Sequence, residues 1–168
     1  MIQSFPPIAD ARATRLILGS MPGVASLTAG QYYAHRSNAF WPIMGELLGF
    51  APDAPYPQRV TALSTARIAL WDVLQCCERP GSLDSVILRT SEVANDFAAF
   101  FARHSLITEV FFNGGTAEAC FARHAADVGQ RLNLKLTRLP STSPAHAAMR
   151  YEQKRDAWHQ RLSRPALI

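Results

Sequence analysis

Short apolar runs that alternate with helix-like segments constrain this 168-residue chain more than any other feature. The runs predict buried strands at 15–19, 67–71, 109–113 and 134–139. The spacing of apolar residues between and after them predicts helices at 39–50, 58–66, 91–104, 116–128 and 148–162. Because strands that alternate with helices are joined by parallel crossovers, we expect an α/β fold, a three-layer α/β/α sandwich with a central four-stranded parallel sheet. The length predicts a single domain, residues 1–168.

Composition excludes several classes of protein. Hydrophobic residues make up 48% of the chain and charged residues 18%, which excludes a disordered chain. No apolar run approaches the roughly 18 residues of a membrane span, and the first residues lack a signal-peptide pattern, so we expect no membrane partner and a cytoplasmic location. Cys76, Cys77 and Cys120 cannot supply the four ligands of a zinc or iron–sulfur site, and glycine-rich phosphate motifs are absent. We therefore expect no metal and no cofactor.

Positive charge is concentrated at one end of the chain. Residues 131–168 hold eight basic and two acidic residues, a net charge of +6, against −2 for residues 1–130. The basic residues are Arg131, Lys135, Arg138, Arg150, Lys154, Arg155, Arg161 and Arg164. Such a patch favours a polyanionic partner such as nucleic acid. The alternative is an ordinary solvated helix face.

The loops that follow the predicted strands carry most of the unusual chemistry. In a parallel sheet the carboxyl ends of the strands form the working edge, which selects the loops 19–38, 71–85, 113–116 and 140–147. We expect residues 76–85 to be irregular. The segment from Tyr32 to Trp41 combines aromatic rings with hydrogen-bonding groups, a pattern typical of a pocket for a planar polar ligand. Phe40 and Trp41 also fit the start of a buried helix, and for Trp41 the core is the favoured interpretation.

A second hydroxyl-rich segment lies in the last of these loops. Ser141, Thr142 and Ser143 stand between two prolines, an arrangement that suits either phosphate contacts or a helix N-cap. No general base is predicted beside any of these serines, which disfavours a serine hydrolase.

Five segments in order resemble a known enzyme family. GSMPGVAS, GQYYAHRSNAFWPIM, ALWDVLQCCERPGSLDS, FFNGGTAEACF and LPSTSPAHA are similar to the hypoxanthine-DNA glycosylase (DNA-deoxyinosine glycosylase) branch of the uracil-DNA glycosylase superfamily, over roughly residues 4 to 160. The resemblance implies a uracil-DNA glycosylase-like fold and a monofunctional hydrolase that excises hypoxanthine, and also uracil, from double-stranded DNA in base excision repair. The alternatives are a G:U/G:T mismatch-specific uracil/thymine glycosylase, whose His-x-x-Asn-x-Phe-Trp segment is similar, and a non-catalytic α/β module that binds nucleotides or nucleic acid.

The resemblance also implies roles for particular residues. Asn38 would hold the attacking water, and Ser143 would stabilise the leaving base. Phe40 would stack on the extruded base, and Asp72 would read its edge as an ionised acceptor, unless it merely caps a turn. Ser20 and Met21 would line the base site. The residues expected to contact DNA are Pro22, Gly23, Ser141, Thr142, Pro144, His146 and Arg150.

Two departures from the family pattern affect these roles. His35-Arg-Ser-Asn38 lacks the proline usual before Asn38, and Ser143 replaces a stronger histidine or asparagine.

The positions of the two lysines bear on the type of glycosylase. Lys135 and Lys154 are expected outside the site loops, so no amine is predicted for a Schiff base and strand cleavage is not expected. A monomer is the expected state of such a DNA-scanning enzyme.

Overall fold

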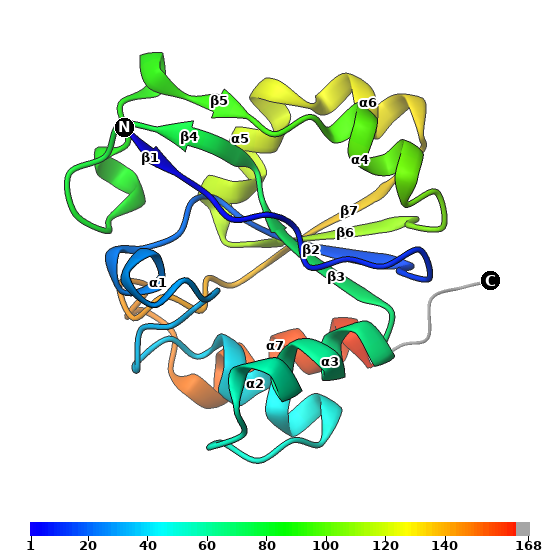
Figure 1. Cartoon of the computed structure of the whole chain (residues 1–168). Coiled ribbons are helices and arrows are strands. Elements are labelled where there is room, and N and C mark those ends of the chain that lie inside the picture. Colours follow the sequence, from blue (N-terminus) through cyan, green and yellow to red (C-terminus); the bar gives the residue numbers. More distant parts are fainter. Residues whose placement is uncertain (164–168) are drawn as a thin grey trace.

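A parallel sheet of four strands forms the centre of the protein (Figure 1). The structure is a computed structural model that describes residues 1–163. The strand order is β3–β2–β6–β7, with β2 at Arg15–Gly19, β3 at Ile68–Asp72, β6 at Glu109–Asn113 and β7 at Lys135–Leu139. Each expected strand lies within one residue of its predicted bounds, and the four-stranded parallel sheet is confirmed.

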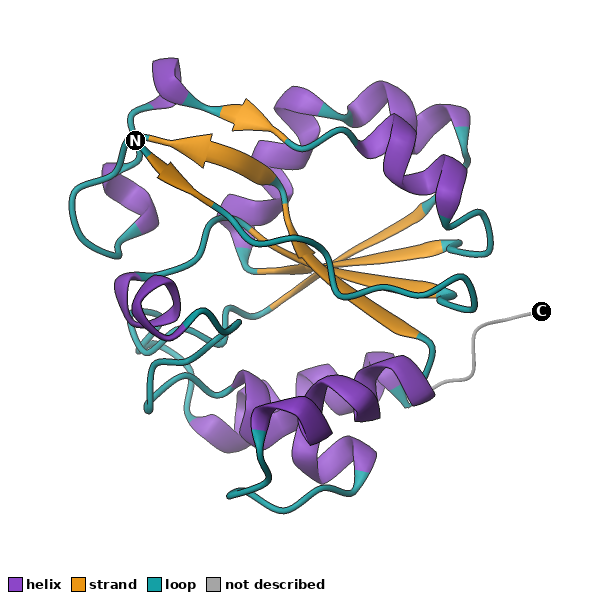
Figure 2. Ribbon diagram, viewed as in Figure 1, coloured by secondary structure: helices purple, strands orange, loops and turns teal. Residues whose placement is uncertain are grey.

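Helices cover both faces of this sheet, as Figure 2 shows. One layer holds α2 (Phe40–Leu48), α3 (Tyr56–Thr65) and α7 (Tyr151–Leu162). The other holds α4 (Phe97–Arg103), α5 (Gly115–His124) and α6 (Ala126–Arg131). Successive strand residues point to opposite layers: Leu16 and Leu18 belong to one buried cluster, and Ile17 to the other. The near-continuous apolar runs are explained by this burial on both faces.

A second, antiparallel sheet was not predicted. It consists of β1 (Ile2–Gln3), β4 (Leu74–Cys77) and β5 (Val93–Ala94), in the order β1–β4–β5. Residues 76–77, expected in a loop, form a strand because they pair with residues 2–3 at the far end of the chain. Residues 92–96 are not helical: Asp96 caps α4 by accepting a hydrogen bond from the Ala99 backbone N–H at 3.0 Å, so the helix starts only after it.

The remaining helices differ from expectation in detail. A short helix, α1 (Val24–Ala29), follows the first strand-end loop and ends at Gly30, whose φ of 64° closes it. The helix expected at 116–128 divides into α5 and α6 at Ala125, which has φ −141°. Two turns of 3-10 helix, Asp84–Val86 and Arg89–Ser91, lie in the segment 78–92 between β4 and β5, which we call the arm. None of the helices in residues 1–163 has the length and apolarity needed to cross a membrane.

Candidate active site

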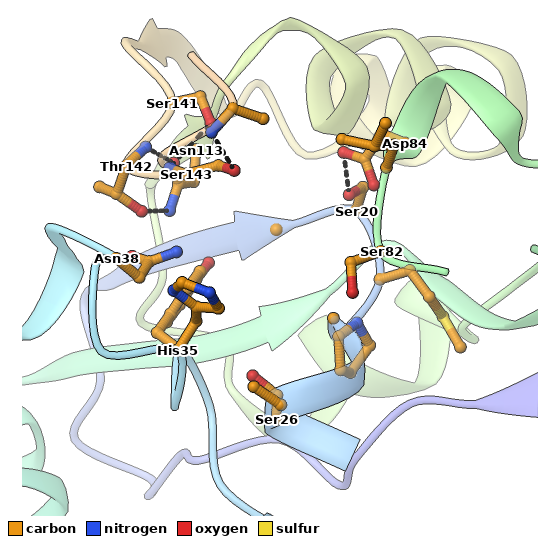
Figure 3. Close-up of a pocket in the computed structure, with 18 of the residues that line it drawn as sticks. Ser20, Ser26, His35, Asn38, Ser82, Asp84, Asn113, Ser141, Thr142 and Ser143 are labelled. Atoms are coloured by element: carbon orange, nitrogen blue, oxygen red, sulfur yellow. Dashed lines mark hydrogen bonds between the residues drawn. The ribbon is translucent and has the colours of Figure 1, made fainter. Parts of the chain in front are cut away.

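A cavity of about 580 Å³ opens at the carboxyl ends of the parallel strands. The loops after all four strands contribute to its wall (Figure 3). The predicted site residues that line it are Ser20, Met21, Pro22, Gly23, Asn38, Asp72, Ser141, Thr142, Ser143, Pro144 and His146. Phe40 and Arg150 lie outside the lining. The topology therefore brings together nearly all of the residues that the sequence selects.

Tyr33, rather than Phe40, forms the aromatic wall of the cavity. Phe40 is 0% exposed because it faces the core from the first turn of α2. The Tyr33 ring stacks on it, with 4.2 Å between ring centroids and 26° between planes, and lines the cavity. Phe40, which the sequence predicts to contact a base, therefore lies behind Tyr33 and not in the cavity wall. A φ of 53° at Tyr33 turns the loop at this point.

Asp72 lies on the cavity floor, at the end of β3. It is 3% exposed, and its Oδ2 has no hydrogen-bond partner within residues 1–163. The Tyr33 hydroxyl is likewise buried and without a partner in this part of the chain. A Cβ at Gly19 would lie 2.5 Å from Asp72 Oδ1 and 2.9 Å from the Tyr33 hydroxyl oxygen. Glycine at the end of β2 therefore makes room for both oxygens.

The ionisation of Asp72 differs from the expected one. Burial and, to a smaller extent, the negative charge of Asp84 raise the pKa of Asp72 from 3.8 to about 7, against an opposing effect of Arg79. At neutral pH much of the population therefore carries a neutral carboxyl group, not the ionised acceptor that the sequence suggests. The neutral carboxyl group of Asp72, on the cavity floor, can donate as well as accept a hydrogen bond.

A buried arginine connects the arm to the first strand-end loop. The side chain of Arg79 is 0% exposed and donates to the backbone oxygens of Pro22 at 2.5 Å and Gly81 at 2.9 Å. It also lies 3.8 Å from the Asp84 carboxylate. Asp84 Oδ2 in turn accepts a hydrogen bond from the Ser20 hydroxyl at 2.6 Å. Through these contacts Asp84 and Ser20 are held on one side of the cavity (Figure 3).

Asn38 faces this group from the other side of the cavity. Its Oδ1 accepts the Phe40 backbone N–H at 3.0 Å, which fixes the orientation of the amide. Its side-chain nitrogen extends toward the middle of the cavity (Figure 3). His35 also lines the cavity, with Nδ1 accepting the Ser37 backbone N–H at 3.1 Å. The turn of residues 35–38 is thus formed by local hydrogen bonds in the absence of the family proline.

The last loop is fixed from two sides. Asn113, at the end of β6, donates to Thr142 Oγ1 and accepts from the Thr142 backbone N–H, both at 2.9 Å. Lys154 on α7 donates to the Ser143 backbone oxygen at 3.0 Å and is 5% exposed. Lys154 therefore lies on α7, outside the four site loops as expected, but its side chain contacts one of them. Lys135, at the start of β7, pairs with Glu109 at the start of β6 at 3.7 Å.

The basic residues are spread over several surfaces. Arg138 pairs with Glu118 at 3.3 Å and Arg155 with Asp156 at 3.0 Å, while Arg164 lies outside the described residues. A smaller hollow of about 300 Å³ adjoins the main cavity and shares Asn38, Pro144 and His146 with it. Arg36 and Lys154 also line that hollow.

Sequence reasoning missed Tyr33 as the wall, and missed Arg79, Ser82, Asp84 and Asn113 entirely as site residues. Asn113 carries the one recoverable signal, because it ends a predicted strand at the working edge. Asp84 and Ser82 enter the cavity through the fold of the arm, which local pattern does not reveal. Within residues 1–163 no group of three or more His, Cys, Asp or Glu side chains is placed to hold a metal.

Known proteins match both the chain and its fold. The model of the uracil DNA glycosylase superfamily matches residues 6–164. A hypoxanthine DNA glycosylase of Methanosarcina barkeri is 37% identical over 113 residues, which is 67% of this chain and 70% of the relative. One of Methanosarcina acetivorans is 35% identical over 68% of this chain and 72% of the relative. The solution NMR structure of a candidate uracil DNA glycosylase from M. acetivorans superposes with a TM-score of 0.77 at 29% identity, covering 96% of this chain and 98% of that one.

The family model and the solved structure each cover nearly the whole chain, and the cavity lies at the carboxyl edge of the shared sheet. The chain therefore belongs to the uracil DNA glycosylase superfamily. Its members hydrolyse N-glycosyl bonds in DNA. This protein is accordingly a DNA glycosylase, and its substrate is DNA.

Proposed function

We propose that this enzyme is a monofunctional glycosylase that removes deaminated bases, hypoxanthine first and uracil second, from double-stranded DNA in base excision repair. The observation that carries the proposal is the composition of the cavity. The side chains of Tyr32 and Tyr33 line a space of about 580 Å³ together with hydrogen-bonding groups from four separate strand-end loops. Such a cavity suits a flat heterocycle with polar edges. The two curated relatives at 35–37% identity are hypoxanthine DNA glycosylases, which supports the choice of base.

The extruded nucleotide would place its base against Tyr33 and direct the base edge toward Asp72. Stacking on an aromatic side chain contributes about 1–3 kcal/mol, which offsets part of the few kcal/mol that unstacking a base from the duplex costs. Asn38 would position the attacking water, since its orientation is fixed by Phe40 and its free amide hydrogens point into the cavity. An amide has no useful pKa, so positioning is the role open to it.

Ser143 would contact the leaving base or a phosphate next to it. Its hydroxyl oxygen accepts the Ala145 backbone N–H at 3.2 Å, which leaves the hydroxyl hydrogen free to donate. Backbone N–H groups near Ser20 and Met21 would face the base from the opposite loop.

The DNA backbone would cross the cavity mouth over Pro22, Gly23, Ser141, Thr142, Pro144 and His146. The adjoining hollow would take a neighbouring phosphate beside Arg36 and Lys154. Arg150, exposed at the start of α7, would extend this track. We further propose that residues 1–168 form one domain, located in the cytoplasm, and that the protein acts as a monomer. Light scattering of the purified protein and of its DNA complex would test the oligomeric state.

Monofunctional hydrolysis follows from the placement of the lysines. Lys154 donates to a backbone carbonyl and does not line the main cavity, and Lys135 lies at a strand edge. We expect abasic sites without strand cleavage and no covalent adduct after borohydride treatment. A trapped adduct that disappears in Lys154→Met would overturn this part of the proposal.

The test is a single-turnover assay on duplexes that carry deoxyinosine, deoxyuridine or thymine opposite each normal base, with alkali to reveal abasic sites. Excision of hypoxanthine supports the proposal. Excision restricted to uracil or thymine opposite guanine would move the substrate to the mismatch class. In Asn38→Ala we expect a loss of at least about 100-fold in excision with duplex binding retained. If the wild-type protein binds the duplexes but excises no base, the protein is a nucleic-acid-binding module and not an enzyme.

A further inference from the structure

We infer that Asp72 is a catalytic acid that protonates the departing base, and that the cavity is therefore specialised for a purine that leaves as a neutral molecule. This inference rests on the proposed function, because it assumes that a base is bound on the cavity floor. It goes beyond reading the base edge, since the proton itself is transferred.

The first support is the environment of the Asp72 carboxyl group. The residue is 3% exposed, and within residues 1–163 nothing donates a hydrogen bond to its Oδ2. An ionised carboxylate buried without a partner costs several kcal/mol, so such a group takes up a proton instead. The protonated form is therefore favoured at this position, and it holds its proton where the base edge would lie.

The second support is the set of charged and titratable groups around Asp72. From the first loop it faces the hydroxyls of Tyr32 and Tyr33, neither of which titrates near neutral pH. From the arm it faces the carboxylate of Asp84 and the guanidinium of Arg79. Arg79 is committed to Asp84 and to backbone carbonyls, so it compensates Asp72 incompletely. Burial together with Asp84 accordingly holds the pKa of Asp72 at about 7.

The third support is the charge of the cavity as a whole. Its lining within the described chain contains two carboxyl groups, Asp72 and Asp84, and no lysine or arginine. The two histidines of the lining, His35 and His146, lie on the loops at the mouth. A base that departs as an anion needs positive charge around it. The Asp72 carboxyl group on the cavity floor supplies a proton instead of positive charge.

The chemistry of the two base classes then selects the substrate. Uracil departs with its negative charge spread over two carbonyls, and its ring has no basic nitrogen to protonate. Hypoxanthine has a basic ring nitrogen, N7, in the same five-membered ring as N9, the atom that leaves the sugar. As the C1′–N9 bond breaks, its electron pair moves onto the base and Asp72 transfers its proton to N7, so neutral hypoxanthine leaves. Water adds to C1′, and the proton it releases returns through solvent to the Asp72 carboxylate.

The pH dependence of single-turnover excision on a deoxyinosine duplex tests the acid role. The wild-type rate should fall on the alkaline side with the slope of one proton. We expect Asp72→Asn to lose about 100-fold or more in rate and to lose the alkaline limb, with duplex affinity within about threefold. Asp127→Asn, which removes an exposed carboxylate on α6, should match the wild type. An alkaline limb that persists in Asp72→Asn would overturn the inference.

Two further measurements separate an acid from a structural carboxyl group. In Asp84→Asn the amide oxygen still accepts from Ser20, but the repulsion of Asp72 is gone, so the alkaline limb should move to lower pH. Carbon-13 NMR of the aspartate carboxyls should show one resonance, absent from Asp72→Asn, that titrates near neutral pH in the whole protein. A resonance for Asp72 that is already ionised at about pH 5 would contradict the inference even without activity data.

The substrate arm uses deoxyinosine, 7-deazadeoxyinosine and deoxyuridine in the same duplex. The wild type should excise the first, fail on the second, which lacks N7, and act on uracil at least about tenfold more slowly. Equal excision of 7-deazadeoxyinosine would overturn the protonation step. If the wild type excises no base at all, the proposed function itself is wrong and the inference falls with it, whereas loss of the pH signature alone overturns only the inference.

Discussion

Two buried carboxyl groups in this protein have opposite environments. Glu92, at the end of the arm, has a side chain that is 3% exposed and accepts from Arg123 Nη2 and His124 Nε2, each at 2.8 Å. Asp72 is 3% exposed as a whole residue, and its Oδ2 has no partner in the described chain. Burial acts to raise the pKa of Glu92, but the hydrogen bonds of His124 and Arg123 lower it overall, whereas the pKa of Asp72 rises to about 7. A buried carboxylate whose oxygens are paired is typical of a structural role, whereas a buried carboxyl group without partners is typical of a functional site.

Arg79→Met should produce the largest change in stability. The substitution leaves Asp84 without its cation and the Pro22 carbonyl without its donor. Breaking a buried charged network of this kind costs about 3–5 kcal/mol. Urea denaturation at neutral pH measures the loss, with Arg89→Met, an exposed arginine on the same arm, as the control. Equal stability of the two variants would show that the arm is not held by Arg79.

Asp72→Asn should have the next largest effect and the opposite sign. Because the pKa of Asp72 is raised from 3.8 to about 7, the unfolded chain ionises first and wild-type stability falls as the pH rises between these values. The amide has no such cost, so the variant should be more stable than the wild type by about 2–4 kcal/mol above pH 7. The difference should vanish below about pH 4. A variant that is less stable than the wild type at pH 8 would contradict this prediction.

Glu92→Gln should destabilise the protein and leave its excision rate unchanged. The two partners are 35% and 28% exposed, so we expect a loss of about 1–2 kcal/mol at neutral pH. Since the pKa of Glu92 is lowered from 4.5, its contribution is present above that value and is lost as the pH falls through the folded-state pKa. Thermal denaturation at several pH values measures this loss. An excision rate altered more than about threefold would break the contrast with Asp72.

Tyr33→Phe should have the smallest effect. The hydroxyl is buried without a partner, so its removal should leave stability unchanged or raise it by about 0.5–1 kcal/mol. The stack on Phe40 remains, and duplex binding should therefore be retained. Tyr33→Ala removes the ring and should weaken binding of an extruded base by about 1–3 kcal/mol. Comparable binding by both variants would show that the ring does not contact the base.

The parallel sheet and the edge that carries the site could be predicted from the sequence, because both depend on short-range patterns. Three of the four parallel strands are apolar runs that end in a polar or glycine residue, namely Gly19, Asp72 and Asn113. The antiparallel sheet could not be predicted, since its pairing of residues 2–3 with 76–77 joins segments that carry no strand-like alternation of their own. Contacts of this separation depend on the whole fold.

The site was predicted at the level of loops and missed at the level of side chains. Phe40 and Tyr33 both belong to one aromatic segment, and the sequence does not reveal which ring lies on top of the other. The positive φ at Tyr33 decides it. Similarly, Lys154 is one basic residue among several on α7, and its burial against the Ser143 carbonyl follows from how that helix packs.

The position of α7 in the chain has a consequence for synthesis. Lys154 and the indole N–H of Trp158 hold the backbone oxygens of Ser143 and Pro140, so the last wall of the cavity is supported by a helix that lies downstream of every strand. A nascent chain that ends before residue 151 contains all four parallel strands but none of α7. During translation, the cavity is therefore completed only after α7 has left the ribosome, and every partly synthesised chain lacks it.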